Sequence, residues 1–339
     1  MSLVSVLVAS EGGMAKYAAI DGSPLEGRAS IHRVHREKGR EGDYEARFDA
    51  VLPEVDAVVV SPWSWCVPPL SEERWAKASR LRVIAGTFSN RLDWLDVADA
   101  TRRGVTVVDT SRSMSPTVAE FGLAMTLNLL RDIPAAVQLV RAGGWKSSAP
   151  WDQPGFVHGD LTGRRVGLAG YGAINRRYAE LLAPFRCAVK AYDPFVPAAD
   201  LRAAGIERVA SLEDLAAHSE IFVVGIPPTK ATREVISRAV IDALPRGASI
   251  IVLTRMAVVE QAALWRRAEN GQIRAAIDVF EPEPPAPDAT FRVSPWVIPT
   301  PHIAGSTTAA HRRCFTSACK DVLAVLAGEP AQYGVPGQG

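Results

Sequence analysis

The stretch Arg165–Asp193, RVGLAGYGAINRRYAELLAPFRCAVKAYD, decides the fold. An apolar run at 166–169 leads into the Gly-Tyr-Gly triplet at 170–172. An amphipathic segment from Ala173 follows, and a second apolar run closes on Asp193. This order predicts a strand, a tight turn, a helix, a second strand and an acid, which together make a βαβ unit.

The turn has the chemistry of a dinucleotide site. Gly170 can make the turn, Gly172 lets the backbone approach a pyrophosphate, and the N–H groups at the helix start face its negative oxygens. Asp193 lies where the fingerprint has an acid that accepts from the adenine ribose hydroxyls. Because Pro194 follows it, rather than Arg or Lys, NAD is expected over NADP. Asn175 replaces the third glycine of the fingerprint, the position that lets the helix pack closely on the strand. We therefore expect the helix to lie slightly displaced from its usual position against the strand. A GxG alone also fits an ordinary strand-to-helix turn, but the βαβ context favours nucleotide binding.

Composition bounds the class of protein. The 339 residues are 47% hydrophobic and 22% charged, which predicts a globular chain with about two domains. Lys and Arg total 38 against 37 Asp and Glu, so the net charge of +1 gives no reason to expect nucleic acid or an anionic membrane as partner. The first ten residues lack a signal-peptide pattern and no long apolar run occurs, which predicts a cytoplasmic protein. The four scattered cysteines predict free thiols, and no metal-ligand spacing is found.

The rest of the chain alternates short apolar runs with helical segments. Strands are predicted at 4–8, 30–34, 55–60, 81–85, 105–108, 221–224, 249–253, 274–278 and 297–298. Helices are predicted at 96–103, 117–142, 212–217, 259–270 and 306–327, the second of them kinked at Pro134. Repeated strand and helix in this order predicts a doubly wound α/β fold.

Four polar residues end or follow predicted strands, where ligands of open parallel sheets bind. Arg255 could hold the carboxylate of a 2-oxo acid and polarise its carbonyl. His302 could give a proton to the carbonyl oxygen as hydride reaches the carbon, with Glu283 paired to the ring to orient it. Asp278 could accept from the carboxamide of a nicotinamide. Taken singly, each residue also has a structural interpretation, as an ion-pair, hydrogen-bonding or solvated side chain.

These residues, in this order, resemble the D-isomer-specific 2-hydroxyacid dehydrogenases, a group that includes phosphoglycerate, glyoxylate/hydroxypyruvate and D-lactate dehydrogenases. The resemblance spans roughly 81–326, and its most specific blocks are DVFEPEP at 278–284 and TPHIAG at 300–305. It implies two Rossmann-like doubly wound α/β domains, with a coenzyme domain at 114–300 inserted into a discontinuous substrate-binding domain at 1–113 and 301–339. It also implies a homodimer and a catalytic set of Arg255, Glu283 and His302. The residues implied to bind NAD are Gly170, Tyr171, Gly172, Ala173, Ile174, Asp193, Pro227, Thr232, Thr254 and Asp278.

The chain departs from the family pattern in two loops. The usual RGG is Arg255-Met256-Ala257, which predicts an altered backbone approach near the nicotinamide. The glycine-containing loop whose amides bind the substrate carboxylate is Phe88-Ser89-Asn90-Arg91. We therefore predict that Asn90 or Arg91 contacts the substrate and that Trp63 lines the substrate pocket. A reshaped surface loop explains the change in sequence equally well.

Three functions follow from the sequence. The first is an NAD-dependent oxidoreductase that interconverts a D-2-hydroxy acid and its 2-oxo acid. The alternative is an NAD(H)-sensing, corepressor-like binding protein with little catalysis, which the altered Asn175 and Met256 suggest. A third is a dehydrogenase for a phosphate- or phosphonate-bearing acid, for which Arg91 would supply an extra cation. Formate dehydrogenases of the same superfamily carry Gln at the position of Glu283, which counts against that activity.

Overall fold

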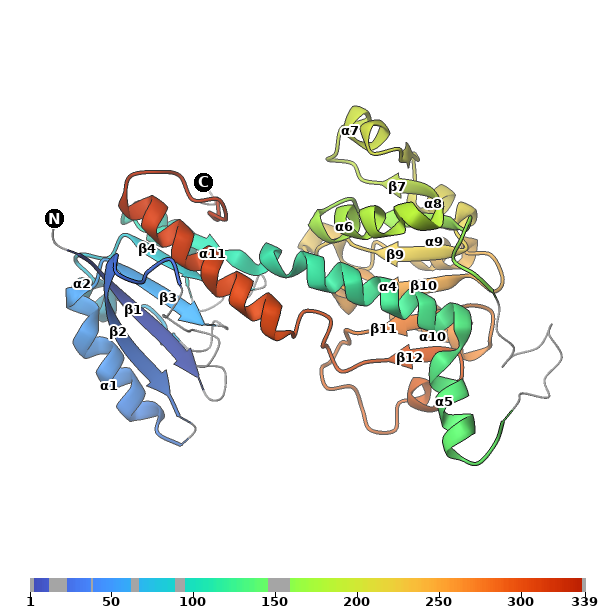
Figure 1. Cartoon of the computed structure of the whole chain (residues 1–339), viewed down its shortest axis with the longest axis horizontal. Helices are drawn as coiled ribbons and strands as arrows, with labels where there is room; N and C mark the ends of the chain where they lie inside the picture. The colour runs from blue at the N-terminus through green and yellow to red at the C-terminus, as the bar shows by residue number, and fades with distance from the viewer. Residues whose placement is uncertain are drawn as a thin grey trace. The chain divides into compact units, whose positions relative to one another are not determined.

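A computed structural model describes residues 3–11, 23–37, 39–61, 67–88, 95–145 and 159–336. The predicted substrate residues Trp63, Asn90 and Arg91 lie outside these ranges. The chain divides into two compact units, Met1–Met114 with Ser306–Gly339, and Ser115–Gly305 (Figure 1). The sequence put the second boundary at 300/301, so His302 falls in the second unit and not in the first. Which unit binds which ligand stays a prediction.

The first unit is built on a five-stranded parallel sheet with helices on both faces (Figure 1). Its order is β2(Ala29–Arg36)-β1(Val4–Glu11)-β3(Ala57–Ser61)-β4(Val83–Gly86)-β5(Thr106–Asp109), a doubly wound order. Helix α11(Thr308–Leu326) packs Phe315 and Val322 on one face. Helices α1(Glu41–Val51), α2(Glu72–Lys77) and α3(Val97–Arg102) cover the other, where Tyr44, Phe48 and Trp75 are buried. The C-terminal segment is therefore part of the N-terminal unit's core.

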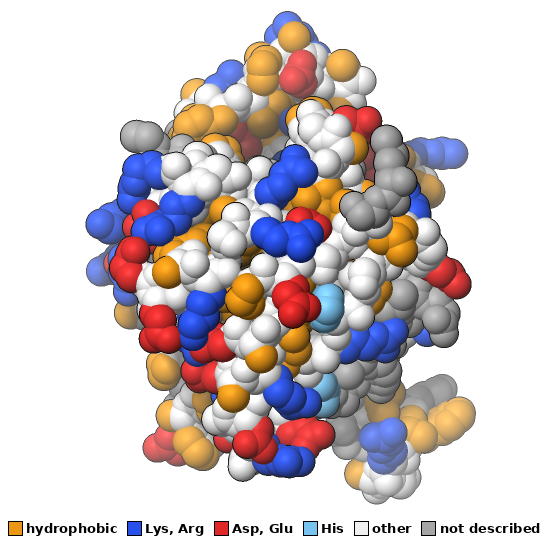
Figure 2. Space-filling view, turned by 90° about the vertical axis from the view of Figure 1, so that its left-hand side faces the viewer, with side chains coloured by type: hydrophobic (Ala, Val, Ile, Leu, Met, Phe, Trp, Pro, Cys, Tyr) orange, Lys and Arg blue, Asp and Glu red, His pale blue; other side chains and the backbone are white. Residues whose placement is uncertain are grey.

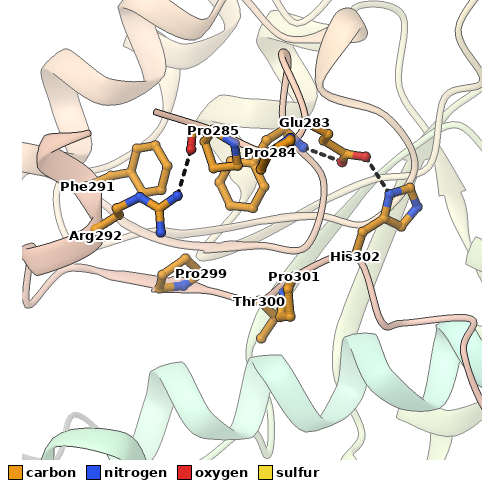
Figure 3. Close-up of a pocket in the computed structure, with 10 residues that line it drawn as sticks. Glu283, Pro284, Pro285, Phe291, Arg292, Pro299, Thr300, Pro301 and His302 are labelled. Carbon is orange, nitrogen blue, oxygen red and sulfur yellow. Dashed lines mark hydrogen bonds and ion pairs between the residues drawn. The ribbon is translucent and has the colours of Figure 1, made fainter. Parts of the chain in front are cut away.

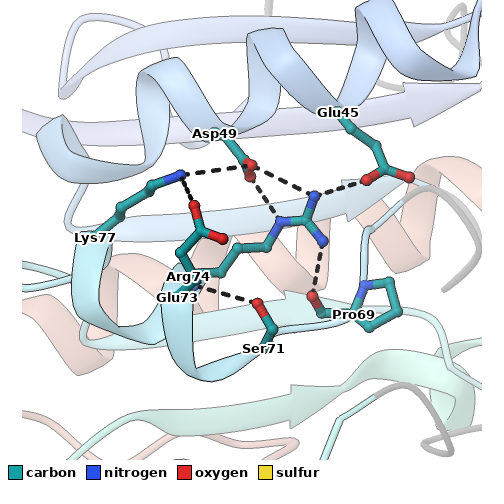
Figure 4. Close-up of polar contacts among 7 residues, drawn as sticks. All are labelled: Glu45, Asp49, Pro69, Ser71, Glu73, Arg74 and Lys77. Carbon is teal, nitrogen blue, oxygen red and sulfur yellow. Dashed lines mark hydrogen bonds and ion pairs between the residues drawn. The ribbon is translucent and has the colours of Figure 1, made fainter.

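Arg74 ties two of these helices together (Figure 4). Its guanidinium donates to Asp49 and Glu45 of α1, each at 2.7 Å, and to the Pro69 carbonyl at 3.0 Å. The side chain is only 14% exposed, so these contacts are shielded from solvent more than an ordinary surface pair. Arg74 thereby links α2 to α1 and to the segment that precedes α2.

Charges on the face seen in Figure 2 are mixed, with basic and acidic side chains interspersed among its described residues. Several of the first unit's charges are paired locally, for example Arg40 with Asp43 at 3.1 Å and Arg80 with Asp56 at 3.0 Å. Positive charge is therefore balanced close to where it occurs.

The second unit is a seven-stranded parallel sheet. Its order is β12(Val297–Pro299)-β11(Arg274–Ile277)-β10(Ser249–Val252)-β9(Ile221–Val224)-β6(Arg165–Ala169)-β7(Ala188–Tyr192)-β8(Glu207–Arg208). One face is covered by α8(Leu212–His218), α9(Arg238–Ala243) and α10(Gln261–Glu269), and α4(Ser115–Arg131) packs with α6(Ala173–Leu182) and against β10 and β11. A short helix, α7(Ala198–Ala203), precedes β8. The strand order reverses between β6 and β9, which is where ligands bind in doubly wound sheets.

The predicted helix 117–142 is two helices, which corrects the expectation of one kinked helix. Helix α4 ends at Arg131, α5(Ile133–Arg141) begins after Asp132 at φ +48°, and the chain bends there by 62°. Pro134 has no N–H to continue the ladder and its ring would clash with the preceding turn, so a break replaces the kink. Among the described residues no single helix is long and apolar enough to cross a membrane, and the bent pair meets that test by length and composition alone.

Candidate active site

The glycine turn lies at the carboxyl end of β6. Gly170 has φ +83°, and a Cβ there would lie 3.2 Å from the carbonyl carbon and oxygen of Gly225, so both its conformation and its surroundings require glycine. Gly172 caps α6 with open space beside it. No side chain caps this helix start and its first turn has no acidic residue, so its N–H groups suit an anionic pyrophosphate. Tyr171 is buried, and Ala173 and Ile174 are half-buried in the first turn.

Asp193, which follows β7, is half-buried, and its carboxylate contacts the backbone of the glycine turn. One carboxylate oxygen accepts from the Tyr171 N–H at 2.7 Å, and the other accepts from Phe195 and Val196 at 2.9 and 3.2 Å. The carboxylate is thus held by backbone before any ligand binds. A ribose hydroxyl would use its remaining lone pairs, and this contact stays a prediction.

Three other predicted cofactor residues stabilise the loops after β9 and β10. Thr232 donates to the Pro227 carbonyl at 2.7 Å, and Thr254 donates to the Ile226 carbonyl at 3.0 Å. These bonds hold the loops at the same edge of the sheet as the glycine turn. Direct contact between them and NAD stays a prediction.

Glu283 and His302 form a hydrogen-bonded pair after β11 and β12 (Figure 3). His302 Nδ1 lies 2.8 Å from Glu283 Oε2, and Glu283 Oε1 accepts from the Phe280 N–H at 2.8 Å. An ionised carboxylate only accepts, so Nδ1 carries the proton and Nε2 is left for a substrate. Burial would raise the pKa of Glu283, but the bonds from His302 and Phe280 and the charges of His302 and Arg255 lower it below its ordinary value.

Arg255 follows β10 and is half-buried, and its Nη1 donates to the Thr254 carbonyl at 2.7 Å. Its charge contributes to the lowered pKa of Glu283. The strands that precede Arg255, Glu283 and His302 are neighbours in one parallel sheet, so the chain leaves all three at the same edge. The three predicted catalytic residues thus follow three neighbouring strands, β10, β11 and β12, and their joint catalytic role stays a prediction.

Asp278 has a role that the sequence did not reveal. It is fully buried and accepts from the Thr300 hydroxyl at 2.6 Å and from the N–H groups of Ile303 and Ala304 at 3.0 and 2.8 Å. His302 sits inside this loop at φ +53°, which is unusual for a residue other than glycine. Asp278 therefore holds the backbone that carries His302. Its contact with a carboxamide stays a prediction.

The side chain of Met256 is 1% exposed and packs in the core of the unit. The residue that replaces the first family glycine after Arg255 thus contributes to the apolar core, and the altered backbone approach near the nicotinamide stays a prediction. Asn175 is also fully buried, in the first turn of α6.

A pocket of about 590 Å³ lies beside the Glu283–His302 pair (Figure 3). Its other walls are mainly apolar and include Pro284, Phe291 and Pro299. The described residues that line it do not include Gly170, Tyr171 or Gly172. No group of three His, Cys, Asp or Glu residues that could hold a metal occurs in the described ranges.

Comparisons with known proteins identify the family. The model for the "D-isomer specific 2-hydroxyacid dehydrogenase, NAD binding domain" matches residues 123–304, more than half of the chain. D-3-phosphoglycerate dehydrogenase of Mycobacterium tuberculosis is 35% identical over 281 residues, which are 83% of this chain and 51% of that protein. Hydroxypyruvate reductase of Thermotoga maritima is 29% identical over 88% of this chain and 95% of its own. The crystal structure of an NADPH-dependent glyoxylate/hydroxypyruvate reductase from Sinorhizobium meliloti has a TM-score of 0.77 at 25% identity, covering 98% of each chain.

The chain belongs to the D-isomer-specific 2-hydroxyacid dehydrogenase family. The predicted Rossmann-like α/β fold and NAD cofactor are confirmed. The chain spans about half the length of the phosphoglycerate dehydrogenases that it matches.

Proposed function

We propose that this protein is an NAD-dependent oxidoreductase that interconverts a D-2-hydroxy acid and its 2-oxo acid. The observation that carries the proposal is the 2.8 Å contact between His302 Nδ1 and Glu283, with the charge of Arg255 acting on the same carboxylate. Reduction of an α-oxo acid requires a cation, an imidazole and an acid close to the nicotinamide. Here these three groups follow strands of the same parallel sheet whose β6 leads into the uncapped helix α6.

The chemistry divides among these residues as follows. The nicotinamide, when bound, supplies or accepts the hydride at the substrate's second carbon. Arg255 binds the carboxylate with its planar fork and polarises the carbonyl. Nε2 of His302 gives a proton to the carbonyl oxygen during reduction and takes it back from the hydroxyl during oxidation. Glu283 keeps the proton on Nδ1 and stabilises the charged ring.

The test mixes the protein with NADH and a panel of 2-oxo acids, including glyoxylate, hydroxypyruvate and a phosphorylated acid, and follows the absorbance of the reduced nicotinamide. We expect turnover of at least one acid, with NADH preferred over NADPH. Measurable NADH binding without turnover of any acid would instead favour the alternative, an NAD(H)-sensing protein with little catalysis.

We also infer that the protein is a homodimer of the cytoplasm. Helix α5 buries no side chain, and it exposes Ile133, Val137, Leu139 and Val140 by 37–52%. An exposed apolar face of this kind is a candidate self-association surface. Cys187, Cys314 and Cys319 are free thiols, which fits a reducing compartment. Sedimentation should give twice the 36.4 kDa chain mass, and Val140→Glu should shift it toward the monomer.

A further inference from the structure

Asn175 and Gly225 meet where the strand order of the second sheet reverses, the first after β6 and the second after β9. Asn175 is fully buried, and its Nδ2 donates to the Gly170 carbonyl at 2.7 Å. That carbonyl belongs to the glycine at φ +83°, which makes the turn. The amide therefore acts on the backbone that would receive the pyrophosphate.

Gly225 provides the space for this amide. A Cβ at Gly225 would lie 2.3 Å from Nδ2, 2.6 Å from Cγ and 2.9 Å from Oδ1 of Asn175. These are the three nearest atoms, and all are closer than real Cβ contacts. Any residue larger than glycine at 225 must displace the Asn175 amide from its position below the turn.

The orientation of the amide is also fixed. Rotating it would set Oδ1 against the Gly170 carbonyl, two acceptors facing each other. In the observed orientation Oδ1 is buried and has no hydrogen-bond partner among the described residues. An unpaired buried acceptor costs free energy, which the hydrogen bonds of Nδ2 offset: the short one to Gly170 and a longer one, 3.4 Å, to the Ala169 carbonyl.

We propose that Asn175 is a positioning residue for the dinucleotide, acting through the Gly170 turn, and that Gly225 is the partner that makes this possible. The fingerprint's third glycine lets helix and strand approach because it lacks a side chain. In this chain the residue without a side chain is Gly225, which follows β9, and the Asn175 amide fills the space beside it and donates to the turn. The inference rests on the proposed function in that the ligand of the turn is NAD(H).

The test is a double-mutant cycle in the full-length protein, read out as the Kd for NADH and for ADP-ribose, which carries the pyrophosphate without a nicotinamide. Asn175→Ala should weaken both ligands about 5-fold, because one hydrogen bond to the turn is lost. Gly225→Ala should weaken both about 10-fold, because its Cβ displaces the amide. The double variant should bind no more weakly than Asn175→Ala alone, since the methyl group then occupies vacated space. KM for the 2-oxo acid and kcat at saturating NADH should stay within about 2-fold.

Tyr178→Phe is the matched control. Tyr178 is fully buried on the same helix, and its hydroxyl pairs with Thr126 at 2.7 Å, away from the turn. It should lower the melting temperature and leave both Kd values unchanged. Additive losses in the cycle, or unchanged ADP-ribose binding in Asn175→Ala, would overturn the inference. If Gly225→Ala fails to fold, the Kd values of Asn175→Ala and of the double variant still test the inference. A wild-type protein that binds neither ligand would overturn the proposed function as well, whereas wild-type binding with unchanged variants overturns this inference alone.

Discussion

Glu283→Gln is the sharpest perturbation of the proposed catalytic set, because it changes hydrogen-bonding capacity and charge without changing size. The carboxylate accepts two bonds with two oxygens, one from His302 Nδ1 and one from the Phe280 N–H, both at 2.8 Å. A carboxamide has one oxygen. If it accepts from Phe280, its NH₂ faces Nδ1 and the imidazole must move its proton to Nε2. If it accepts from His302, its NH₂ faces the Phe280 N–H.

Either arrangement loses one charge-assisted hydrogen bond, worth about 1.5–3 kcal/mol. If that bond stabilises the charged imidazole, kcat for reduction should fall about 10- to 100-fold. KM for NADH should change little.

Steady-state NADH oxidation measures kcat and KM for NADH in both proteins. Glu281→Gln is the matched control, since Glu281 lies in the same loop and its carboxylate lies 3.6 Å from the guanidinium of the exposed Arg233. A kcat for Glu283→Gln within about 2-fold of wild type would refute the assigned role of Glu283.

Glu283→Gln should also change how the stability of the folded protein depends on pH. The pKa of Glu283 is lower in the folded state than its ordinary value, so its contribution is present above the ordinary pKa and is lost as pH falls through the folded one. Glu283→Gln lacks this contribution. The difference in melting temperature between wild type and variant should therefore narrow as pH falls from about 6 to about 3. A constant difference would contradict the assignment.

Three further variants separate the remaining roles. Arg255→Lys keeps the charge but loses the fork, so KM for the 2-oxo acid should rise about 30-fold with the NADH Kd unchanged; a rise below about 3-fold argues against carboxylate binding there. Asp193→Asn removes the charge that opposes a 2′-phosphate, so the preference in kcat/KM for NADH over NADPH should narrow about 10-fold, and an unchanged ratio contradicts this. Arg74→Met breaks the bonds to Glu45 and Asp49, so chemical denaturation should give a free energy of unfolding about 1–3 kcal/mol lower, with NADH affinity retained. Unchanged unfolding would mean that these pairs are energetically neutral.

Much of the fold could be predicted because buried parallel strands are apolar along their whole length. The predicted strand 221–224 coincides with β9, and the predicted strand 249–253 exceeds β10 by one residue. Helix α1 was not predicted, since only Tyr44 and Phe48 of its eleven residues are buried and no apolar stripe marks it. Helix α9, with six residues, is too short for its periodicity to be recognised.

The positions of the candidate catalytic residues could be predicted for a different reason. All strands of the second sheet are parallel, so the residues that follow β10, β11 and β12 lie at one edge, where Glu283 and His302 are in contact and Arg255 follows the neighbouring strand. The residues that hold them could not be found this way. Gly225 is recognisable as the partner of Asn175 only when two segments 50 positions apart are brought into contact.

Asp278 shows why a candidate catalytic residue must be distinguished from a residue that positions it when the effect of a mutation is interpreted. Because its carboxylate accepts three hydrogen bonds from Thr300, Ile303 and Ala304, a substitution there displaces the loop that carries His302 even if no ligand touches Asp278. Loss of kcat in Asp278→Asn is therefore no evidence for a bond to the nicotinamide carboxamide. Only a loss of NADH affinity without an equal loss of ADP-ribose affinity would support that bond, because ADP-ribose has no carboxamide. Equal binding of NADH by wild type and variant, with kcat reduced, would instead assign Asp278 wholly to positioning His302.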